Sequence, residues 1–442
     1  MSRIDGIKQI VDDRIEAERD ALFALGEEIL HEPELGFKEH ATSARVQDWF
    51  TRLKLPHRAG LAVTGVKAVL DTGRPGPTVC LMGELDAIVV PGHPHADSES
   101  HAAHACGHNA QIAGLMAAAT GLTDDRVLSE LSGRIVFFAV PAEEFVELAF
   151  RKQLIDDGVI EFIGGKPELI RLGEFDDVDL AMMIHTSAPM DDERAVEIWE
   201  SMNGLIAKTV EFHGKAAHVG NPWDGVNALK AATLAMDAID AQREIFREDD
   251  GVRVHHIISR GGDLVNVVPS EVVLEMNVRG KTADAIQKAS EVVDRCVSAG
   301  AMAIGARAVV DTNPGYLPLR NHQSLVDLMT PNVERFFGEG CLGYRGHSGA
   351  CTDTGDVSHL VPTVQPSMAG ASGQGHGRDW TIADPVAAYL NPGKTLAMTA
   401  IDLLRGDADE AQGILASWEA PMTKDEYLAF QRGIRSKASF GG

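Results

Sequence analysis

The sequence lacks the cysteine pattern of a disulfide-stabilised protein and the long apolar runs of a membrane protein. Its five cysteines are an odd number spread over 442 residues, which argues against a disulfide framework. No apolar run approaches the ~20 residues of a membrane span, and the N-terminus lacks the apolar stretch of a secretory signal. We therefore expect a cytoplasmic protein that does not enter a membrane.

Positive charge is also scarce. The chain has 40 lysines and arginines against 65 aspartates and glutamates, a formal net charge of -25. This surplus repels phosphate backbones, which argues against nucleic acid as a partner. A solvated acidic surface accounts for the charge without a further role, so we expect a small-molecule substrate as the partner.

The composition is otherwise that of an ordinary globular protein, with 44% hydrophobic and 24% charged residues. A chain of this length exceeds what one hydrophobic core usually organises. Two domains are therefore expected, each with a sizeable core.

Hydrophobic periodicity predicts the elements of the first part of the chain. It predicts a helix over 7–30, a second helix that Thr42 caps and that ends near residue 54, and a third over 110–120. Apolar β-rich runs predict strands at 65–70, 78–84, 134–140 and 180–184. Helices that alternate with buried strands are typical of α/β proteins, so we expect a largely parallel sheet flanked by helices.

The pattern changes near residue 200. Strands are predicted at 206–213, 252–259, 272–278 and 306–311, with helices over 228–242 and 283–298. These elements make a smaller α+β unit. Because the candidate ligand His376 lies beyond it, we expect a catalytic domain of residues 1–199 and 313–442, into which residues 200–312 are inserted.

The predicted strands are followed by side chains that bind metals. Cys106 and His108 precede the third helix, Glu143 and Glu144 follow the strand at 134–140, and His185 and His376 come later. Thiolate, imidazole and carboxylate are the ligand set that a pair of divalent transition metals prefers. Adjacent glutamates also allow one ligand and one general base, which indicates a metal-dependent hydrolase.

No single residue of this set is specific. A loop histidine is more often an ordinary polar residue than a ligand, and a lone cysteine usually behaves as a small hydrophobe. Two glutamates directly after a buried strand are harder to dismiss, because burying carboxylates is costly without a metal, a cation or a proton.

Six motifs spread over most of the chain support this interpretation. They are Glu84-Leu85-Asp86-Ala87, His104-Ala105-Cys106-Gly107-His108, Pro141-Ala142-Glu143-Glu144, Gly214-Lys215-Ala216-Ala217-His218, Asn266-Val267-Val268-Pro269 with Arg279, and Thr352-Asp353-Thr354-Gly355-Asp356-Val357. In this order they resemble the amidohydrolase branch of the aminoacylase/carboxypeptidase metallopeptidases. The sequence resembles the aminobenzoyl-glutamate hydrolase subgroup of this family more than the auxin-conjugate hydrolases, on the basis of Asn109, His376 and Trp380.

The resemblance implies a catalytic domain with two metal positions and an inserted dimerisation, or lid, domain. Its implied metal ligands are Cys106, whose thiolate can bridge, His108, Glu144, His185 and His376. Glu143 is then the general acid/base, and Asp86 orients the site. In the inserted domain, His218 is implied in catalysis and Asn266 in substrate contact, with Arg279 as a candidate for binding a substrate carboxylate.

The expected reaction is hydrolysis of a C-N bond. A metal lowers the pKa of bound water towards about 7, Glu143 takes the proton and returns it to the leaving nitrogen, and His218 stabilises the developing oxyanion. The leading hypothesis is an amide substrate, an N-acyl or N-aminobenzoyl amino acid. The alternative is hydrolytic deamination of an electron-poor aromatic amine such as 5-nitroanthranilate, which releases ammonia.

One segment departs from the related hydrolases. They follow the glutamate pair with a glycine-rich stretch, whereas this chain has the bulky and charged residues 145–152. The segment is either a plain helix packed on the core or a lining that narrows the site for a flat aromatic substrate with an acid group. The histidines at 93, 95, 101 and 104 are expected to be solvated loop residues.

Other properties stay open at this stage. Manganese, zinc, cobalt and nickel all tolerate the mixed ligand set, with one or two ions in each protomer. The inserted domain implies a homodimer or a higher homo-oligomer. A non-catalytic relative that uses its metal structurally is disfavoured, because Glu143 has no purpose in such a site.

Overall fold

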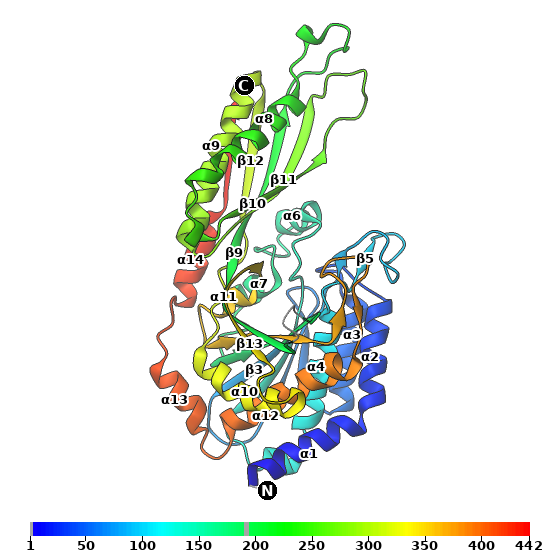
Figure 1. Cartoon of the computed structure of the whole chain (residues 1–442), viewed down its shortest axis with the longest axis vertical. Helices are drawn as coiled ribbons and strands as arrows, with labels where there is room; N and C mark the ends of the chain where they lie inside the picture. The colour runs from blue at the N-terminus through cyan, green and yellow to red at the C-terminus, as the bar shows by residue number, and fades with distance from the viewer. Residues whose placement is uncertain (1–2, 190–193) are drawn as a thin grey trace. The chain divides into compact units, whose positions relative to one another are not determined.

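A mixed sheet organises the first of the two units into which the chain divides. The computed structural model describes residues 3–189 and 194–442. Unit 1 comprises Met1–Glu200, Arg320–Gly346 and Asp356–Pro421. Unit 2 comprises Ser201–Leu319, His347–Gly355 and Met422–Gly442. The elements of both units are labelled in Figure 1.

The sheet of unit 1 has the strand order β1-β2-β6-β3-β7-β14. Its strands are β1 (His57–Leu61), β2 (Gly65–Asp71), β6 (Arg134–Val140), β3 (Thr78–Glu84), β7 (Leu180–Met182) and β14 (Thr363–Val364). The pairings among β6, β3, β7 and β14 are parallel, whereas β1 and β2 join antiparallel at one edge. The expected α/β class is thereby confirmed.

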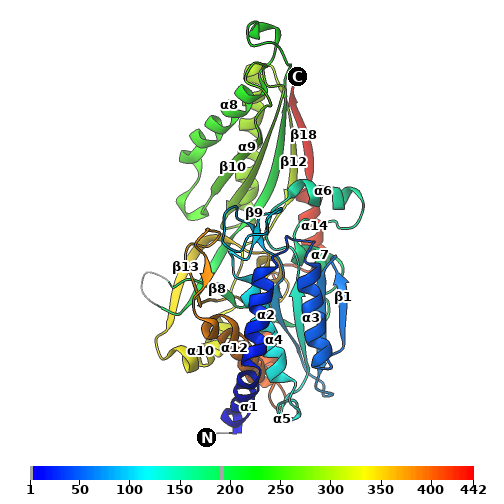
Figure 2. The same cartoon turned by 90° about the vertical axis from the view of Figure 1, so that its right-hand side faces the viewer.

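Helices flank this sheet. The longer ones are α1 (Arg3–Ala17), α2 (Arg19–His31), α3 (His40–Arg52), α4 (His108–Leu122), α10 (Gln323–Phe337) and α12 (Asn391–Leu404). Helix α4 packs against β3 and also contacts α1, α2 and α12. Figure 2 shows α3 beside β1. Among the described residues, no helix is both long and apolar enough to span a membrane.

Short elements complete unit 1. The helices are α5 (Asp125–Leu128), α6 (Leu148–Asp156), α7 (Gly165–Arg171) and α13 (Asp409–Ser417). The strands are β4 (Ile88–Val89), β5 (Ala102–Ala103), β8 (His185–Ser187), β15 (Ser367–Ala369), β16 (Ala371–Ser372) and β17 (Thr381–Ile382).

The expected N-cap at Thr42 is wrong. Helix α3 begins at His40 with Glu39 as its N-cap residue. The Thr42 hydroxyl donates instead to Glu34 Oε2 at 3.0 Å, and the Thr42 backbone N–H donates to the same oxygen at 2.8 Å. A carboxylate from the preceding loop therefore satisfies first-turn donors of this helix.

The core of unit 1 explains why its central strands are so apolar. Every residue of β3 is buried, as are all but the first residue of β6. A strand enclosed on both faces must be hydrophobic throughout, apart from its ends. The polar residues that matter for chemistry therefore stand where these strands stop.

Unit 2 is an antiparallel sheet covered by two helices. Its strands run in the order β10 (Arg253–Arg260), β11 (Glu271–Gly280), β9 (Val196–His213), β12 (Arg307–Pro314) and β18 (Ser436–Gly441). Helices α8 (Ala228–Ala241) and α9 (Ala283–Ile304) contribute to its apolar core. Helix α14 (Lys424–Ile434) also belongs to unit 2, whereas β13 (Leu342–Cys351), which pairs with β9, and α11 (Thr354–Val357) are divided between the two units.

Helix α9 shows why the sequence of unit 2 folds in this way. The Thr282 side chain accepts a hydrogen bond from the Ala285 backbone N–H, and Gly305 ends the helix with φ of 75°. Between these caps, Ala289, Val293 and Val297 recur every four residues and are buried. The helix therefore turns one apolar stripe towards the sheet.

Candidate metal centre

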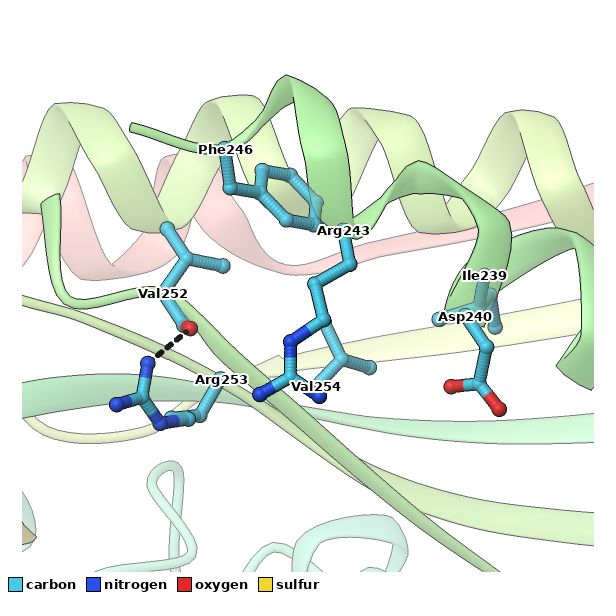
Figure 3. Close-up of a pocket in the computed structure, with 7 residues that line it drawn as sticks. All are labelled: Ile239, Asp240, Arg243, Phe246, Val252, Arg253 and Val254. Carbon is cyan, nitrogen blue, oxygen red and sulfur yellow. Dashed lines mark hydrogen bonds between the residues drawn. The ribbon is translucent and has the colours of Figure 1, made fainter. Parts of the chain in front are cut away.

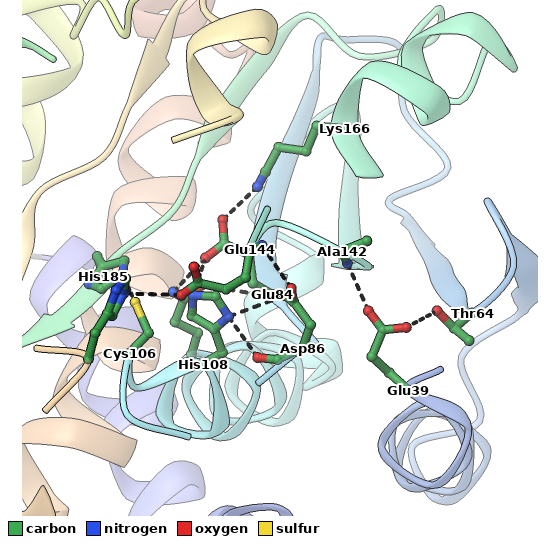
Figure 4. Close-up of polar contacts among 12 residues, drawn as sticks. Glu39, Thr64, Glu84, Asp86, Cys106, His108, Ala142, Glu144, Lys166 and His185 are labelled. Carbon is green, nitrogen blue, oxygen red and sulfur yellow. Dashed lines mark hydrogen bonds and ion pairs between the residues drawn. The ribbon is translucent and has the colours of Figure 1, made fainter. Parts of the chain in front are cut away.

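The predicted ligands of unit 1 lie close together although they come from separate segments (Figure 4). Cys106 lies in the loop before α4, and His108 is the first residue of that helix. Glu144 follows β6, and His185 begins β8. His376 lies between β16 and β17, where its backbone N–H donates to the Ala105 carbonyl at 2.8 Å.

Three of these side chains form one group and three form another, with Cys106 common to both. The ligand atoms of Cys106, His108 and His185 lie within 4.8 Å of one another, and so do those of Cys106, Glu144 and His376. A sulfur shared by two sets of donors is placed as a bridging ligand would be. A third group joins Glu84, His108 and Glu143 within the same distance.

Gly107 allows Cys106 and His108 to serve one site. Its φ of 88° lies in the left-handed region, which side chains other than glycine rarely adopt. A Cβ at this position would also approach the Thr186 Cβ to 3.0 Å. The turn and the close approach of Thr186 both require glycine between the two candidate ligands.

The orientation of His108 is fixed by Asp86. His108 Nδ1 lies 2.8 Å from the Asp86 carbonyl oxygen, which can only accept, so Nδ1 carries the proton. Burial lowers the pKa of His108, but Glu84 and Asp86 outweigh it and raise the pKa to about 9, and a metal would take the place of the proton on Nε2. The same Asp86 accepts from the Glu144 backbone N–H through Oδ2 at 2.8 Å, so it holds two candidate ligands at once.

Two charged residues of the site received no role from the sequence pattern. Lys166 Nζ lies 2.6 Å from Glu84 Oε1, with both side chains almost fully buried. Glu84 Oε2 accepts from Gln111 Nε2 at 2.8 Å and lies 3.1 Å from His108 Nε2. Burial alone raises the pKa of Glu84, but Lys166 and His108 outweigh it and lower the pKa to about 2, so Glu84 is ionised. A glutamate at the end of a fully buried strand was the available sequence signal for this pair.

The donor set fits a cation. His108 Nε2 and Glu144 Oε1 are buried and make no hydrogen bond with the described residues, although Glu144 Oε1 lies 3.2 Å from His376 Nε2. Burial and the neighbouring Glu144 and Glu143 raise the pKa of the Cys106 thiol above its ordinary value. Such a thiol ionises only with a positive charge beside it, which a bound metal supplies.

Two of the four loop histidines are not solvated, contrary to expectation. His93 is buried, and its Nε2 lies 2.9 Å from the Trp380 carbonyl. His104 is also buried, and neither of its ring nitrogens has a hydrogen-bond partner among the described residues. Burial, aided by His108, lowers the pKa of His104 to about 3. His104 is therefore a neutral packed ring beside the site.

The three candidate substrate residues belong to unit 2. His218 and Asn266 are exposed on neighbouring segments, because His218 forms a β-bridge with Val267 and the Val219 N–H donates to the Asn266 carbonyl at 3.2 Å. Arg279 lies on β11, opposite Leu205 of β9. The structure thus brings His218 and Asn266 together, with Arg279 on a strand of the same unit.

A separate pocket of about 330 Å³ lies in unit 2 (Figure 3). It is lined by Ile239, Asp240, Arg243, Phe246, Val252, Arg253 and Val254. None of the residues with a predicted catalytic role lines it, so it is distinct from the candidate metal centre.

Comparison with known proteins shows that the relatives of this chain are hydrolases. Residues 201–302 match the peptidase dimerisation domain of the M20 family. The mouse Xaa-Arg dipeptidase is 28% identical, covering 97% of this chain and 95% of the relative. A component of the p-aminobenzoyl-glutamate hydrolase of Escherichia coli K12 is 32% identical over 49% of this chain and 48% of its own length.

A solved structure agrees with this assignment at the level of the fold. The YXEP protein of Bacillus subtilis, described as a dinuclear metal binding peptidase from the M20 family, superposes with a TM-score of 0.64. It is 19% identical and covers 88% of this chain and 99% of its own. The fold is therefore that of peptidases with an inserted dimerisation domain. Residues 201–302 thus form an M20-type dimerisation domain, and the chain is homologous to amidohydrolases of the M20 family.

Proposed function

We propose that this protein is a metal-dependent hydrolase that cleaves the amide of an N-acyl or N-aminobenzoyl amino acid. The observation that carries the proposal is the meeting of Cys106, His108, Glu144, His185 and His376 in two groups that share one sulfur, with Glu143 beside them. This donor set suits one or two divalent transition ions better than it suits a purely structural role.

The metal would be held by residues of unit 1 alone. Cys106, His108 and His185 would make one position, and Cys106, Glu144 and His376 the other. A divalent ion bound there polarises the electrophilic carbonyl and lowers the pKa of water. The family relative described as dinuclear supports two positions, and the donors accept manganese, zinc, cobalt or nickel.

Glu143 is the group that we assign to proton transfer. It is buried, it immediately precedes the proposed ligand Glu144, and its carboxylate lies within 4.8 Å of donor atoms of Glu84 and His108. A carboxylate in this position can take a proton from attacking water and deliver it to the leaving nitrogen. We assign stabilisation of the oxyanion to His218, and substrate contacts to Asn266 and Arg279.

A carboxylate-bearing substrate is supported by two relatives. The names p-aminobenzoyl-glutamate hydrolase and indole-3-acetyl-aspartic acid hydrolase both describe an acyl group joined to an acidic amino acid. The second of these proteins, from Enterobacter agglomerans, is 32% identical over 52% of this chain and 51% of its own length.

A dipeptide is the second candidate substrate. Two relatives that match this chain over more than 90% of its length, from mouse and human, are each named Xaa-Arg dipeptidase. Both candidates are amides, so the same Glu143 proton transfer serves either bond.

A mass-resolved substrate screen on metal-reconstituted protein tests the proposal. The pool contains N-acyl amino acids, aminobenzoyl-glutamate, Xaa-Arg dipeptides and substituted anthranilates, with Glu143→Gln as the control. Release of a free amino acid by the unmodified protein, lost in Glu143→Gln, is the expected result. Ammonia with a hydroxylated ring, and no amino acid, would instead indicate an aromatic aminohydrolase and contradict the proposal.

We further propose that the protein is a homodimer or a higher homo-oligomer, supported by the match of residues 201–302 to a dimerisation domain. Light scattering on the full chain tests it. A mass of at least twice 47.4 kDa is expected, and a monomer at micromolar concentration would contradict it.

A further inference from the structure

The peptide groups around Glu143 are held by buried charged side chains. The Ala142 backbone N–H donates to Glu39 Oε1 at 2.8 Å, and the Glu144 backbone N–H donates to Asp86 Oδ2 at 2.8 Å (Figure 4). Glu39 and Asp86 are both fully buried. The N–H groups on either side of Glu143 are therefore fixed by two carboxylates.

One cation contacts the carbonyl groups of the same two residues, and the Ala142 carbonyl also accepts from the Gly165 backbone N–H at 3.1 Å. Arg151, from α6, donates through Nη2 to the Glu144 carbonyl and through Nη1 to the Ala142 carbonyl, the latter a long contact of 3.5 Å. Nη1 also donates to the Ile163 carbonyl at 2.6 Å. One guanidinium thus ties the loop that carries Glu143 to the segment that follows α6.

Burying the Arg151 guanidinium costs free energy that packing contacts alone would not offset. Arg151 is the one buried residue of α6, with no exposed surface, and no carboxylate of the described residues lies within ion-pair distance of it. Burying an unpaired cation is unfavourable unless hydrogen bonds replace its hydration. Three carbonyl acceptors replace the hydration of Nη1 and Nη2, whereas Nε has no hydrogen-bond partner among the described residues, so the two Nη atoms are what link the guanidinium to the loop.

The loop needs such support because its backbone is strained. Ala142 has φ of 54°, in the left-handed region that residues with a side chain rarely adopt. Strained backbone persists only where the surroundings determine it. The contacts on both the N–H and the carbonyl of Ala142 meet that requirement.

Gly36 leaves space for the Arg151 guanidinium, and two aromatic rings lie beside it. Gly36 lies so close that a Cβ there would approach Arg151 Nη2 to 2.5 Å and the Ala142 Cα to 2.9 Å. The guanidinium also lies over the Phe37 ring, 5.3 Å from its centroid, and 5.8 Å from that of Phe145. Aromatic faces of this kind favour a cation.

We propose that Arg151 is a positioning residue of the metal centre, which holds the backbone around Glu143 so that Glu144 keeps its place as a ligand. It lies in the segment 145–152, directly after the glutamate pair. Arg151 acts through the peptide groups of Ala142 and Glu144 and touches no reacting atom. The inference rests on the proposed metal function.

Cobalt binding to the purified full chain, without substrate, tests the inference. The affinity for Co²⁺ and the sulfur-to-cobalt charge-transfer band are measured for Arg151→Met, Arg151→Lys and the control Lys152→Met. Lys152 is the neighbouring cation of α6, half exposed and paired with Asp156 in the same helix. Unfolding midpoints are recorded for all variants, which separates a loss of stability from a loss of metal affinity.

Arg151→Met is expected to weaken Co²⁺ binding about 10–100-fold, as loss of a group that orients ligands usually does. Arg151→Lys keeps the cation but spans fewer carbonyls, so a smaller loss is expected, and Lys152→Met should bind as the unmodified chain does. A folded Arg151→Met whose Co²⁺ affinity stays within about twofold would overturn the inference.

If Arg151→Met does not fold, Arg151→Lys and Gly36→Ala are decisive, the latter because its Cβ would displace both the guanidinium and the Ala142 backbone. Unchanged Co²⁺ affinity in both would overturn the role of Arg151. If the unmodified chain binds no Co²⁺, the proposed metal centre is wrong, and the proposed role of Arg151 is then wrong too. The two failures are therefore distinguishable.

Discussion

Cys106 Sγ lies 3.4 Å from His185 Nε2, although the two residues are 79 positions apart in the sequence. The same sulfur belongs to the donor group of Glu144 and His376. A thiolate shared in this way makes both proposed metal positions depend on one side chain.

Metal content should therefore fall unequally in single variants. His185→Ala and His376→Ala each remove a donor from one group, whereas Cys106→Ala removes a donor from both. We expect Cys106→Ala to retain less metal than either histidine variant after dialysis, measured by mass spectrometry of the metal. Cys106→Ala with the metal content of the unmodified chain would show that the sulfur is not a shared ligand.

Loss of Lys166 should destabilise the protein strongly. Lys166→Met removes the lysine cation from the buried Glu84 carboxylate, and breaking such a pair costs about 3–5 kcal/mol of unfolding free energy. Denaturant unfolding of the metal-free protein measures the loss. The double variant Lys166→Met with Glu84→Gln removes the unpaired carboxylate and should recover part of the lost unfolding free energy. An equal loss in the single and double variants would mean that the unpaired Glu84 charge does not cause the destabilisation.

The stability of the metal-free protein should depend on pH through Glu39. Burial, together with the charge of Asp86, raises the pKa of Glu39 to about 7. A carboxyl whose pKa is raised on folding stabilises the fold fully below its unfolded pKa, and the stabilisation is lost as pH rises towards 7. Glu39→Gln keeps an acceptor for the Ala142 N–H but cannot ionise.

Glu39→Gln should thus be more stable than the unmodified chain at pH 8, by up to ~3 kcal/mol, with little difference below pH 4.5. Denaturant midpoints at the two pH values provide the check. A constant difference across this range would mean that Glu39 does not titrate as argued.

Much of this site could be predicted from the sequence because its chemistry is concentrated at the ends of buried strands. Glu143 and Glu144 directly follow β6, and His185 follows the apolar run of β7. Apolar strands have an unmistakable pattern, and polar residues that interrupt them are few. The α/β class followed from the same pattern.

Apart from Asp86, whose orienting role the family resemblance implied, the supporting residues could not be predicted, because most of their contacts are distant in sequence. Glu39 and Ala142 are 103 positions apart, and Lys166 and Glu84 are 82 apart. No local spacing connects such pairs. Arg151 was visible only as one charge in an unusual segment, and the sequence does not indicate that it faces inwards. The pairing of β18 with β12, which brings the last strand into unit 2, likewise had no local signal.

Glu143→Gln should retain metal and lose turnover. The amide is close in shape to the carboxylate, so metal content should stay that of the unmodified chain, while kcat falls about 10²–10⁴-fold through loss of proton transfer. Glu144→Gln is the matched comparison, because loss of the adjacent proposed ligand should lower metal content as well. Loss of metal in Glu143→Gln would mean that Glu143 is a ligand and not the general base.

The central claim, amide hydrolysis at a metal centre with Glu143 as the base, is tested most directly by one measurement. Metal-reconstituted protein and its Glu143→Gln variant are incubated with aminobenzoyl-glutamate, N-acyl amino acids and Xaa-Arg dipeptides, and the products are resolved by mass. The account predicts a free amino acid from at least one of these amides, dependent on metal and lost in Glu143→Gln. Equal turnover by both proteins, or turnover that survives complete removal of metal, would contradict it.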